Sequence, residues 1–161
     1  MHLRPYRDDD FETLAGAWRA ASVVAHDFLT PDFLDAEVES IREVYLPAAE
    51  TWIAESEGQP VGFLSLMGSE IGALFVHPGH WGKGIGQALL AKAIELRGDL
   101  LLKLFAENTV GRHFFAAAGF VEKGTETHAE TGREVVRLEL AATGGARPEP
   151  NDSGAAESKD L

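Results

Sequence analysis

The sequence predicts one α/β (α+β) domain built from alternating strands and helices. Its length of 161 residues suffices to bury a core, and 45% hydrophobic with 25% charged residues is ordinary for a globular protein. Apolar residues recur at helical spacing in four segments and fill strand-length runs between them. The predicted order of elements is β-α-α-β-β-β-α-β-α-β-β.

The first half of the chain is predicted to supply a strand, two helices and a hairpin. A strand over Leu3–Arg7 leads into three aspartates that begin a helix, whose apolar face fades near His26. Thr30 and Pro31 supply a capping hydroxyl and a first-turn proline for the second helix. Two strands over Thr51–Glu55 and Val61–Met67 are predicted to pair across Gly58-Gln59-Pro60.

The second half is predicted to alternate strands with two helices. After the strand Ile71–Val76, a helix follows a glycine-rich turn and ends at Gly98. The remaining predicted elements are the strand Leu100–Ala106, the helix Val110–Ala118, and the strands Val121–Thr127 and Glu134–Leu140, which turn at Gly132.

The chain is predicted to end in a disordered tail. We assign residues 1–142 to the folded domain and residues 143–161 to the tail, which has one large apolar residue at its very end. The N-terminus does not resemble a signal peptide, and no apolar run approaches the roughly 20 residues that a membrane helix needs. These features favour a cytoplasmic protein.

The charge distribution limits the class of partner. A net charge of −12 argues against nucleic acid, whose phosphates call for a basic surface. Between Asp8 and Glu57 lie thirteen acidic residues and only two basic ones, Arg19 and Arg42. This half forms either a solubilising face or a field that gathers cationic substrates. The chain has no cysteine, which excludes disulfides, a thiolate nucleophile and a cysteine-bound zinc.

The strongest functional motif is the segment LFVHPGHWGKGIGQALL at Leu74–Leu90. Gly82, Gly84 and Gly86 immediately precede or open a helix, so the backbone can pass close to a ligand and present N–H groups at the positive end of the helix dipole. Such a place suits a diphosphate. The spacing is neither that of a P-loop nor that of a dinucleotide fingerprint. The alternative, a plain strand–turn–helix connection, is disfavoured because each ordered glycine costs stability.

Two segments resemble the GNAT family of N-acetyltransferases. VHPGHWGKGIGQALL resembles the family's acetyl-CoA-binding pattern, and Asn108 followed by FFAAAGF resembles its Asn…Phe-Tyr-x-x-x-Gly-Phe segment. The resemblance covers Leu3–Leu140. SVVAHDFL and PVGFLSL further resemble a bacterial subgroup, the YjaB-like acetyltransferases. The implied fold is the GNAT acyl-CoA N-acyltransferase fold, with a central mixed, mostly antiparallel sheet flanked by helices.

The resemblance implies a site for acetyl-CoA as co-substrate. The backbone of the strand ending at Val76 would pair with the pantetheine arm, and the Val76 amide would polarise the acetyl carbonyl. Main-chain N–H groups from Gly82 through Gln87 would hold the diphosphate. Asn108 would hydrogen-bond the arm, although its residue type also suits a turn after a strand. The implied cofactor-binding residues are Leu74, Phe75, Val76, Gly82, Lys83, Gly84, Ile85, Gly86, Gln87 and Asn108.

The chain departs from the family pattern at two positions. Trp81 stands where the family has Gln or Arg, which removes a side-chain contact to phosphate, and Lys83 is either a compensating charge or a solvent-facing lysine. Phe115 stands where many relatives have a tyrosine that protonates the departing thiolate. Because phenylalanine has no proton to give, another group or water serves, activity is low, or the chain only binds.

The acceptor amine must lose a proton, so the reaction needs a base. Glu70 lies six residues before Val76, the offset of the glutamate base in the histone-acetyltransferase branch of the family, and is otherwise an exposed residue at a strand start. His26, in the loop between the first two helices, either borders the acceptor cleft or merely packs there. His113 is expected to face solvent. His77, His80 and His128 lack metal-ligand spacing, so no metal is predicted.

The resemblance therefore predicts an N-acetyltransferase that moves the acetyl group directly from acetyl-CoA to a primary amine, either a small cationic amine or a peptide or protein amine. The first alternative is an acyl-CoA-binding sensor with weak or no transfer, which Phe115 motivates. The second is a protein that binds a different phosphate ligand. Neither a membrane partner nor a nucleic acid is expected. Dimers are common in the family, but no residue here specifies a homodimer.

Overall fold

The computed structural model describes residues 1–25, 29–141 and 156–157. Its strands are β1 (His2–Pro5), β2 (Glu50–Ser56), β3 (Gln59–Met67), β4 (Glu70–Val76), β5 (Leu100–Phe105), β6 (Val121–Thr127), β7 (Glu134–Leu140) and β8 (Ala156–Glu157). Its α-helices are α1 (Phe11–Ala25), α2 (Pro31–Ser40), α3 (Leu46–Ala48), α4 (Ile85–Arg97) and α5 (Thr109–Ala117). Short 3-10 turns cover Asp8–Asp10 and Pro78–His80, and a π-helical turn covers Ile41–Tyr45.

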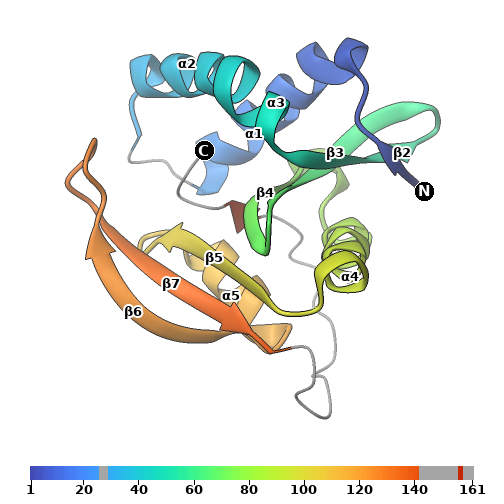
Figure 1. Cartoon of the computed structure of the whole chain (residues 1–161). Helices are drawn as coiled ribbons and strands as arrows, with labels where there is room; N and C mark the ends of the chain where they lie inside the picture. Colours follow the sequence, from blue (N-terminus) through green and yellow to red (C-terminus); the bar gives the residue numbers. More distant parts are fainter. Residues whose placement is uncertain (26–28, 142–155, 158–161) are drawn as a thin grey trace.

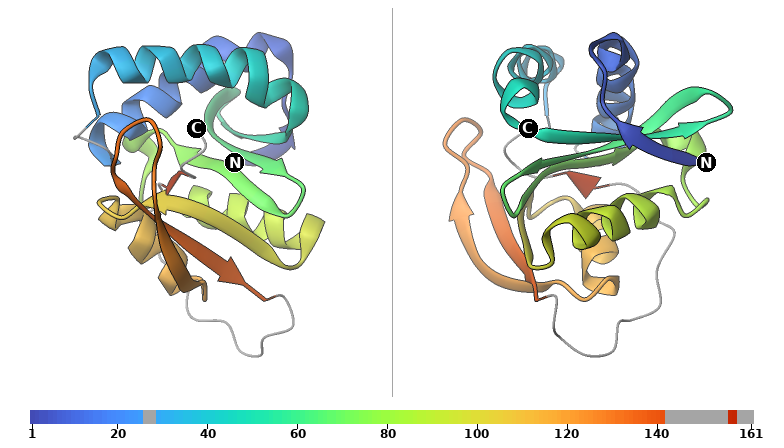
Figure 2. Two further views of the ribbon diagram at one scale, coloured as in Figure 1. Left: turned by 60° about the vertical axis from the view of Figure 1, so that its left-hand side comes forward. Right: turned by 45° about the vertical axis from the view of Figure 1, so that its right-hand side comes forward.

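The strands form one mixed sheet in the order β1-β2-β3-β4-β5-β7-β6. Every neighbouring pair along this path is antiparallel except β4 and β5, which are parallel. This arrangement confirms the expected mixed, mostly antiparallel sheet. In Figure 1 the half formed by β5, β7 and β6 diverges from the half that contains β1 to β4, and the views in Figure 2 agree.

Helices cover both faces of the sheet, so the protein has three layers and two apolar clusters. One cluster joins α1 and α2 to one face through fully buried side chains such as Trp18, Phe63 and Phe75. The other joins α4 and α5 to the opposite face through Leu89, Phe114 and their neighbours. No helix within the described ranges is long and apolar enough to cross a membrane.

Local sequence signals account for most element boundaries. The Thr30 hydroxyl oxygen accepts a hydrogen bond from the Phe33 N–H at 3.1 Å, with Pro31 in the first turn, as expected. The predicted bounds of β6 and β7 are confirmed to the residue. The hairpin prediction is right, but its turn was placed wrongly: Glu57 and Gly58 adopt positive φ angles of 54° and 79°, and the residues after them already belong to β3.

A partly buried ionic network connects the first strand to the start of α1. The Asp10 carboxylate accepts hydrogen bonds from two guanidinium nitrogens of Arg4, at 2.8 and 2.7 Å, and from the Arg7 backbone N–H at 2.7 Å. Arg4 also pairs with Glu55 on β2. The hydrogen bond from Arg4 holds the pKa of Asp10 below its ordinary value.

Asp10→Asn is expected to lower the free energy of unfolding by about 2 kcal/mol at neutral pH, because a charge-assisted interaction is lost. Since the folded-state pKa of Asp10 is lowered, its contribution is fully present above the unfolded pKa of about 3.9 and is lost as pH falls through the folded value. The gap between variant and wild type should therefore close in acid. Urea unfolding at neutral and acidic pH measures it, with exposed Asp8→Asn as control.

Candidate functional site

The parallel strands β4 and β5 pair only where they begin. Glu70 opposite Leu101 is the one registered pair between them, and their later residues diverge. The divergence starts beside a β-bulge between β3 and β4. Ser65 and Leu66 of β3 pair with Ala73 and Ile71 of β4, so Gly72 is an extra, unpaired residue on β4. The sheet therefore opens along the remaining length of β4.

The main-chain groups of β4 alternate between its neighbour β3 and this opening. The His77 N–H donates to the Val61 carbonyl across the strand pair. The N–H groups of successive residues in a strand point to opposite edges. The amides of Val76 and Leu74 therefore face the opening, while the amide of Phe75 faces β3. Three residues were expected to pair with a cofactor arm. Leu74 and Val76 have main-chain groups that face the opening, whereas Phe75 has a buried side chain in the core and its main-chain groups face β3.

The short strand β8 shows that this edge of β4 can accept an extended backbone. Ala156 and Glu157 pair in antiparallel fashion with Leu74 and Ala73. β8 also contacts β5 and α5, so it lies between the two diverging strands, as Figures 1 and 2 show. The rest of the predicted tail lies outside the described residues.

The glycine-rich turn presents unpaired main-chain donors at the start of α4. Gly82 and Gly84 have φ angles of +78° and +79°, which glycine adopts readily. Gly84 is the N-cap and offers no side chain, and the first helical bond runs from the Ala88 N–H to the Gly84 carbonyl at 3.0 Å. The amides of Ile85, Gly86 and Gln87 therefore have no helical acceptor. Free amides at the positive end of a helix dipole are suited to an anion.

Side chains hold the turn between β4 and α4 in place. The Trp81 indole N–H donates to the Val76 carbonyl at 2.7 Å, and the His77 Nδ1 accepts from the Gly79 N–H at 3.1 Å. Trp81 thus fastens the end of β4 to the glycine turn, a role that the sequence did not indicate. Lys83 is exposed.

Asn108 caps a helix with one side-chain atom and leaves another unpaired. Its residue is fully buried, and its Oδ1 accepts from the Gly111 N–H at 2.9 Å, which caps α5. Its Nδ2 is buried and finds no hydrogen-bond partner within the described structure. Buried donors are almost always satisfied, so an unpaired one calls for a ligand or an ordered water. The structural role and the binding role therefore use different atoms of one side chain.

Phe115 is core. It is 1% exposed and makes edge-on contacts with Phe114 and Phe120, at ring-centroid distances of 5.1 and 5.0 Å. The phenylalanine side chain offers neither a proton nor a polar contact. The alternatives of another proton donor or water, low activity, or binding alone therefore stay open.

Glu70 lies where β4 and β5 meet. Its side chain is half-buried, and its Oε2 is shielded from solvent without a hydrogen-bond partner among the described residues. An acceptor oxygen in this condition suits a group that takes a proton from a bound amine. The other proposed base, His26, lies outside the described residues. His113 is exposed, and the described residues contain no cluster of potential metal ligands.

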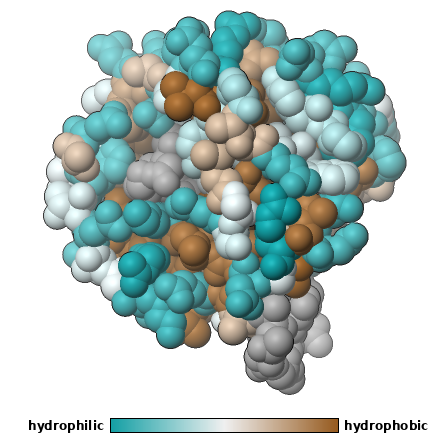
Figure 3. Space-filling model, viewed as in Figure 1, coloured by the Kyte–Doolittle hydropathy of each residue, from teal (hydrophilic) through white to brown (hydrophobic). Residues whose placement is uncertain are grey.

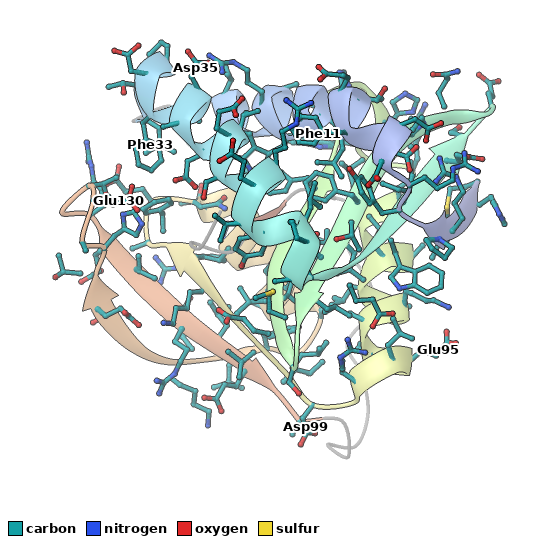
Figure 4. The ribbon with its side chains drawn as sticks, turned by 45° about the horizontal axis from the view of Figure 1, so that its top comes forward. Phe11, Phe33, Asp35, Glu95, Asp99 and Glu130 are labelled. Carbon is teal, nitrogen blue, oxygen red and sulfur yellow. The ribbon has the colours of Figure 1, made fainter. Side chains whose placement is uncertain are left out.

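Exposed carboxylates of α2 and of the β6–β7 turn form an acidic patch, which we call the acidic rim. Asp32 and Asp35 of α2 and Glu130 of the β6–β7 turn are exposed. Figure 4 shows Phe33 of α2 on the side of Glu130, and hydrophilic residues cover much of α2 and the hairpin in Figure 3. Part of the acidity is neutralised internally, because Arg19 pairs with Asp35 and Arg42 lies 3.6 Å from Glu12.

Sequence reasoning missed two residues beside Glu70. Gly72 falls inside the predicted strand Ile71–Val76, and the sequence did not single out Tyr45. The structure brings them together: a Cβ added to Gly72 would lie 2.5 Å from the Tyr45 hydroxyl oxygen. A glycine inside a strand does signal a bulge or a close approach, and this was the one available clue.

Comparisons with known proteins agree with this geometry. A model of the acetyltransferase (GNAT) domain matches residues 47–122. The peptidyl-lysine N-acetyltransferase YjaB of Salmonella typhimurium is 32% identical over 141 residues, which cover 87% of this chain and 97% of the relative. The solution structure of apo YjaB from Escherichia coli has a TM-score of 0.77 at 28% identity, with 86% and 95% covered. The PaiA N-acetyltransferase of Thermoplasma acidophilum, solved with coenzyme A, shares the fold at 18% identity, a TM-score of 0.67 and coverage of 84% and 96%.

Proposed function

Because this chain belongs to the GNAT family of acetyltransferases, we propose that it transfers the acetyl group of acetyl-CoA to the side-chain amine of a lysine in a peptide or protein. The acetyl-CoA-dependent N-acetyltransferase activity follows from the family. The identity of the acceptor amine is the part of the proposal that goes beyond the family. It rests on the peptidyl-lysine N-acetyltransferases among the relatives and on the acidic rim, which attracts cationic segments.

The observation that carries the proposal is the open edge of β4, which leads to the unpaired amides of α4. Main-chain groups of Leu74 and Val76 would pair with the pantetheine arm, and the Asn108 Nδ2 would donate to one of its carbonyls. The amides from Gly82 through Gln87 would hold the diphosphate. These contacts use mainly the backbone, which is why Trp81 can replace the family's Gln or Arg.

The chemistry then needs an oriented amine and a base. Once the thioester is bound along β4, a main-chain amide of this strand that faces the opening would donate to the carbonyl oxygen as negative charge develops there. Glu70 would take the proton from the lysine amine as it attacks. Much of the rate would come from holding amine and thioester in line within the opening.

Release of free thiol from acetyl-CoA tests the proposal. We expect turnover with lysine-containing peptides, and less with a polyamine, an aminoglycoside or a peptide whose only amine is its N-terminus. Mass spectrometry should locate the product on the lysine side chain. Turnover confined to a small amine would overturn the acceptor assignment. Saturable CoA binding without thiol release on any amine would favour the acyl-CoA sensor that Phe115 motivates.

Removing residues 143–161 is expected to lower the KM for acetyl-CoA by about two- to tenfold and to leave kcat unchanged. β8 and the pantetheine arm would use the same main-chain groups of β4, so the intact chain binds acetyl-CoA only when β8 is displaced. Initial rates of the truncated and full-length proteins measure the effect. A synthetic peptide of residues 143–161 should raise the KM for acetyl-CoA, but not that for the amine, in the truncated protein. An unchanged KM after truncation would contradict this competition.

A further inference from the structure

Tyr45 lies against the main chain of β4 at the bulge. A Cβ built on Gly72 would lie 2.5 Å from both the Cε1 and the hydroxyl oxygen of Tyr45 and 2.8 Å from its Cζ. Real Cβ atoms do not approach other atoms so closely, so no other residue fits at position 72 without moving the phenol. Gly72 thus makes room for the hydroxyl end of Tyr45, not merely for the edge of its ring.

Irregular backbone on both sides creates this contact. The π-helical turn Ile41–Tyr45 follows α2 directly, and the Leu46 N–H donates a hydrogen bond to the Ile41 carbonyl across it. This turn places Tyr45 beyond the end of α2. π-Helical turns are rare and are often found at functional sites. On the other side of the contact, the β-bulge places Gly72 at the point of β4 that Tyr45 approaches. The half-buried Tyr45 side chain packs with the hydrophobic cluster under α1 and α2. This is the face of the sheet on which α2, with its exposed carboxylates, lies.

The order of groups along β4 relates this hydroxyl to the reaction. The anion-binding amides of α4 follow Val76 at one end of the strand, and the shielded carboxylate oxygen of Glu70 lies at the other. A pantetheine arm that starts at those amides and runs along Val76 and Leu74 brings its sulfur toward Gly72. The Tyr45 hydroxyl is at Gly72, two residues from Glu70. Phe115, buried among aromatic rings, has no proton for that sulfur.

Resting on the function proposed above, we propose that Tyr45 is the proton donor to the departing sulfur of coenzyme A. The lysine nitrogen forms a bond to the acetyl carbon, and the bond between that carbon and sulfur breaks. Glu70 takes one proton from the nitrogen, while the Tyr45 hydroxyl gives one to the sulfur. Solvent then carries a proton from Glu70 back to the phenolate, so the products are an acetyl-lysine and a neutral thiol.

Tyr45→Phe tests the assignment, with Tyr6→Phe as the matched control. Tyr6 is the other tyrosine of the chain; it follows β1, and its N–H donates to the Thr51 carbonyl of β2. We expect Tyr45→Phe to lower kcat by about 100-fold with little change in the KM for acetyl-CoA, and Tyr6→Phe to change neither. Adding Phe115→Tyr to the Tyr45→Phe protein should restore part of kcat, because it returns a phenol to the family's usual position. An unchanged kcat in Tyr45→Phe would overturn the proposal.

A binding measurement without turnover separates this inference from the proposed function. If the hydroxyl donates to sulfur, it lowers the pKa of the thiol of bound CoA, which the ultraviolet absorbance of the thiolate reports. Tyr45→Phe should raise that pKa while calorimetry finds the same affinity for CoA. An unshifted thiol pKa would remove Tyr45 from the mechanism even if kcat falls. Wild-type protein that fails to bind CoA would instead overturn the proposed function.

Discussion

Replacing Glu70 by glutamine is expected to lower kcat/KM for a lysine peptide by about 100-fold or more at neutral pH, because the amine loses its proton acceptor. The substitution keeps the shape of the side chain and removes only its charge. Since the Oε2 already lacks a hydrogen-bond partner among the described residues, little structure depends on it. Binding of CoA, which uses the other end of β4, should remain unchanged.

The pH dependence of the variant distinguishes a base from a structural residue. A free lysine amine has a pKa of about 10.4, so its neutral fraction rises tenfold per pH unit below that value. Without Glu70 no carboxylate removes a proton from the bound lysine, so only the fraction of amine that is already neutral in solution reacts, and the rate should climb steadily with pH. The deficit relative to wild type therefore shrinks as the solution becomes more alkaline.

Glu95→Gln is the matched control for Glu70→Gln. Glu95 is exposed on α4, where Figure 4 shows it pointing away from α2 and the β6–β7 hairpin. This change should leave both kcat/KM and its pH profile as in wild type. If Glu70→Gln also leaves the pH profile unchanged, Glu70 is not the base, and the role passes to a group or an ordered water on the acceptor side.

The half of the site that would hold acetyl-CoA was predictable because it depends on local backbone properties. Three glycines at alternate positions indicate a turn with accessible amides, and the apolar pattern after them indicates the helix. The structure agrees at Gly82, Gly84 and the start of α4. Asn108 was predicted with its two readings open, and the structure explains why neither reading excluded the other.

The half that would hold the acceptor was not predictable in the same way. The bulge at Gly72 is a property of the register between β3 and β4, and register depends on the packing of both faces of the sheet. The π-helical turn before α3 has no reliable sequence pattern, so the sequence did not point to Tyr45. Nor did the polar composition of the tail suggest that Ala156 and Glu157 would pair with β4.

Gly82→Asp is expected to weaken CoA binding by about 10- to 100-fold, whereas Gly82→Asn should bind within severalfold of wild type. Gly82 has φ of +78°, and a Cβ added there meets no atom within 4 Å. Asn and Asp tolerate this conformation best among residues with side chains, so the backbone strain is nearly the same in both variants. They differ in one negative charge, placed beside the amides proposed to hold the diphosphate.

Because the paired variants share their strain, the difference in affinity measures the electrostatic repulsion alone. It should diminish as salt is added, since ions screen exposed charges over about 10 Å at 0.1 M. S-acetyl-pantetheine, which lacks the diphosphate, should be used equally well by the two variants. Calorimetry with CoA and initial rates with both thioesters supply the measurements. Equal CoA affinity for the aspartate and asparagine variants would mean that the diphosphate binds elsewhere, and the assignment of the amides from Gly82 through Gln87 would fail.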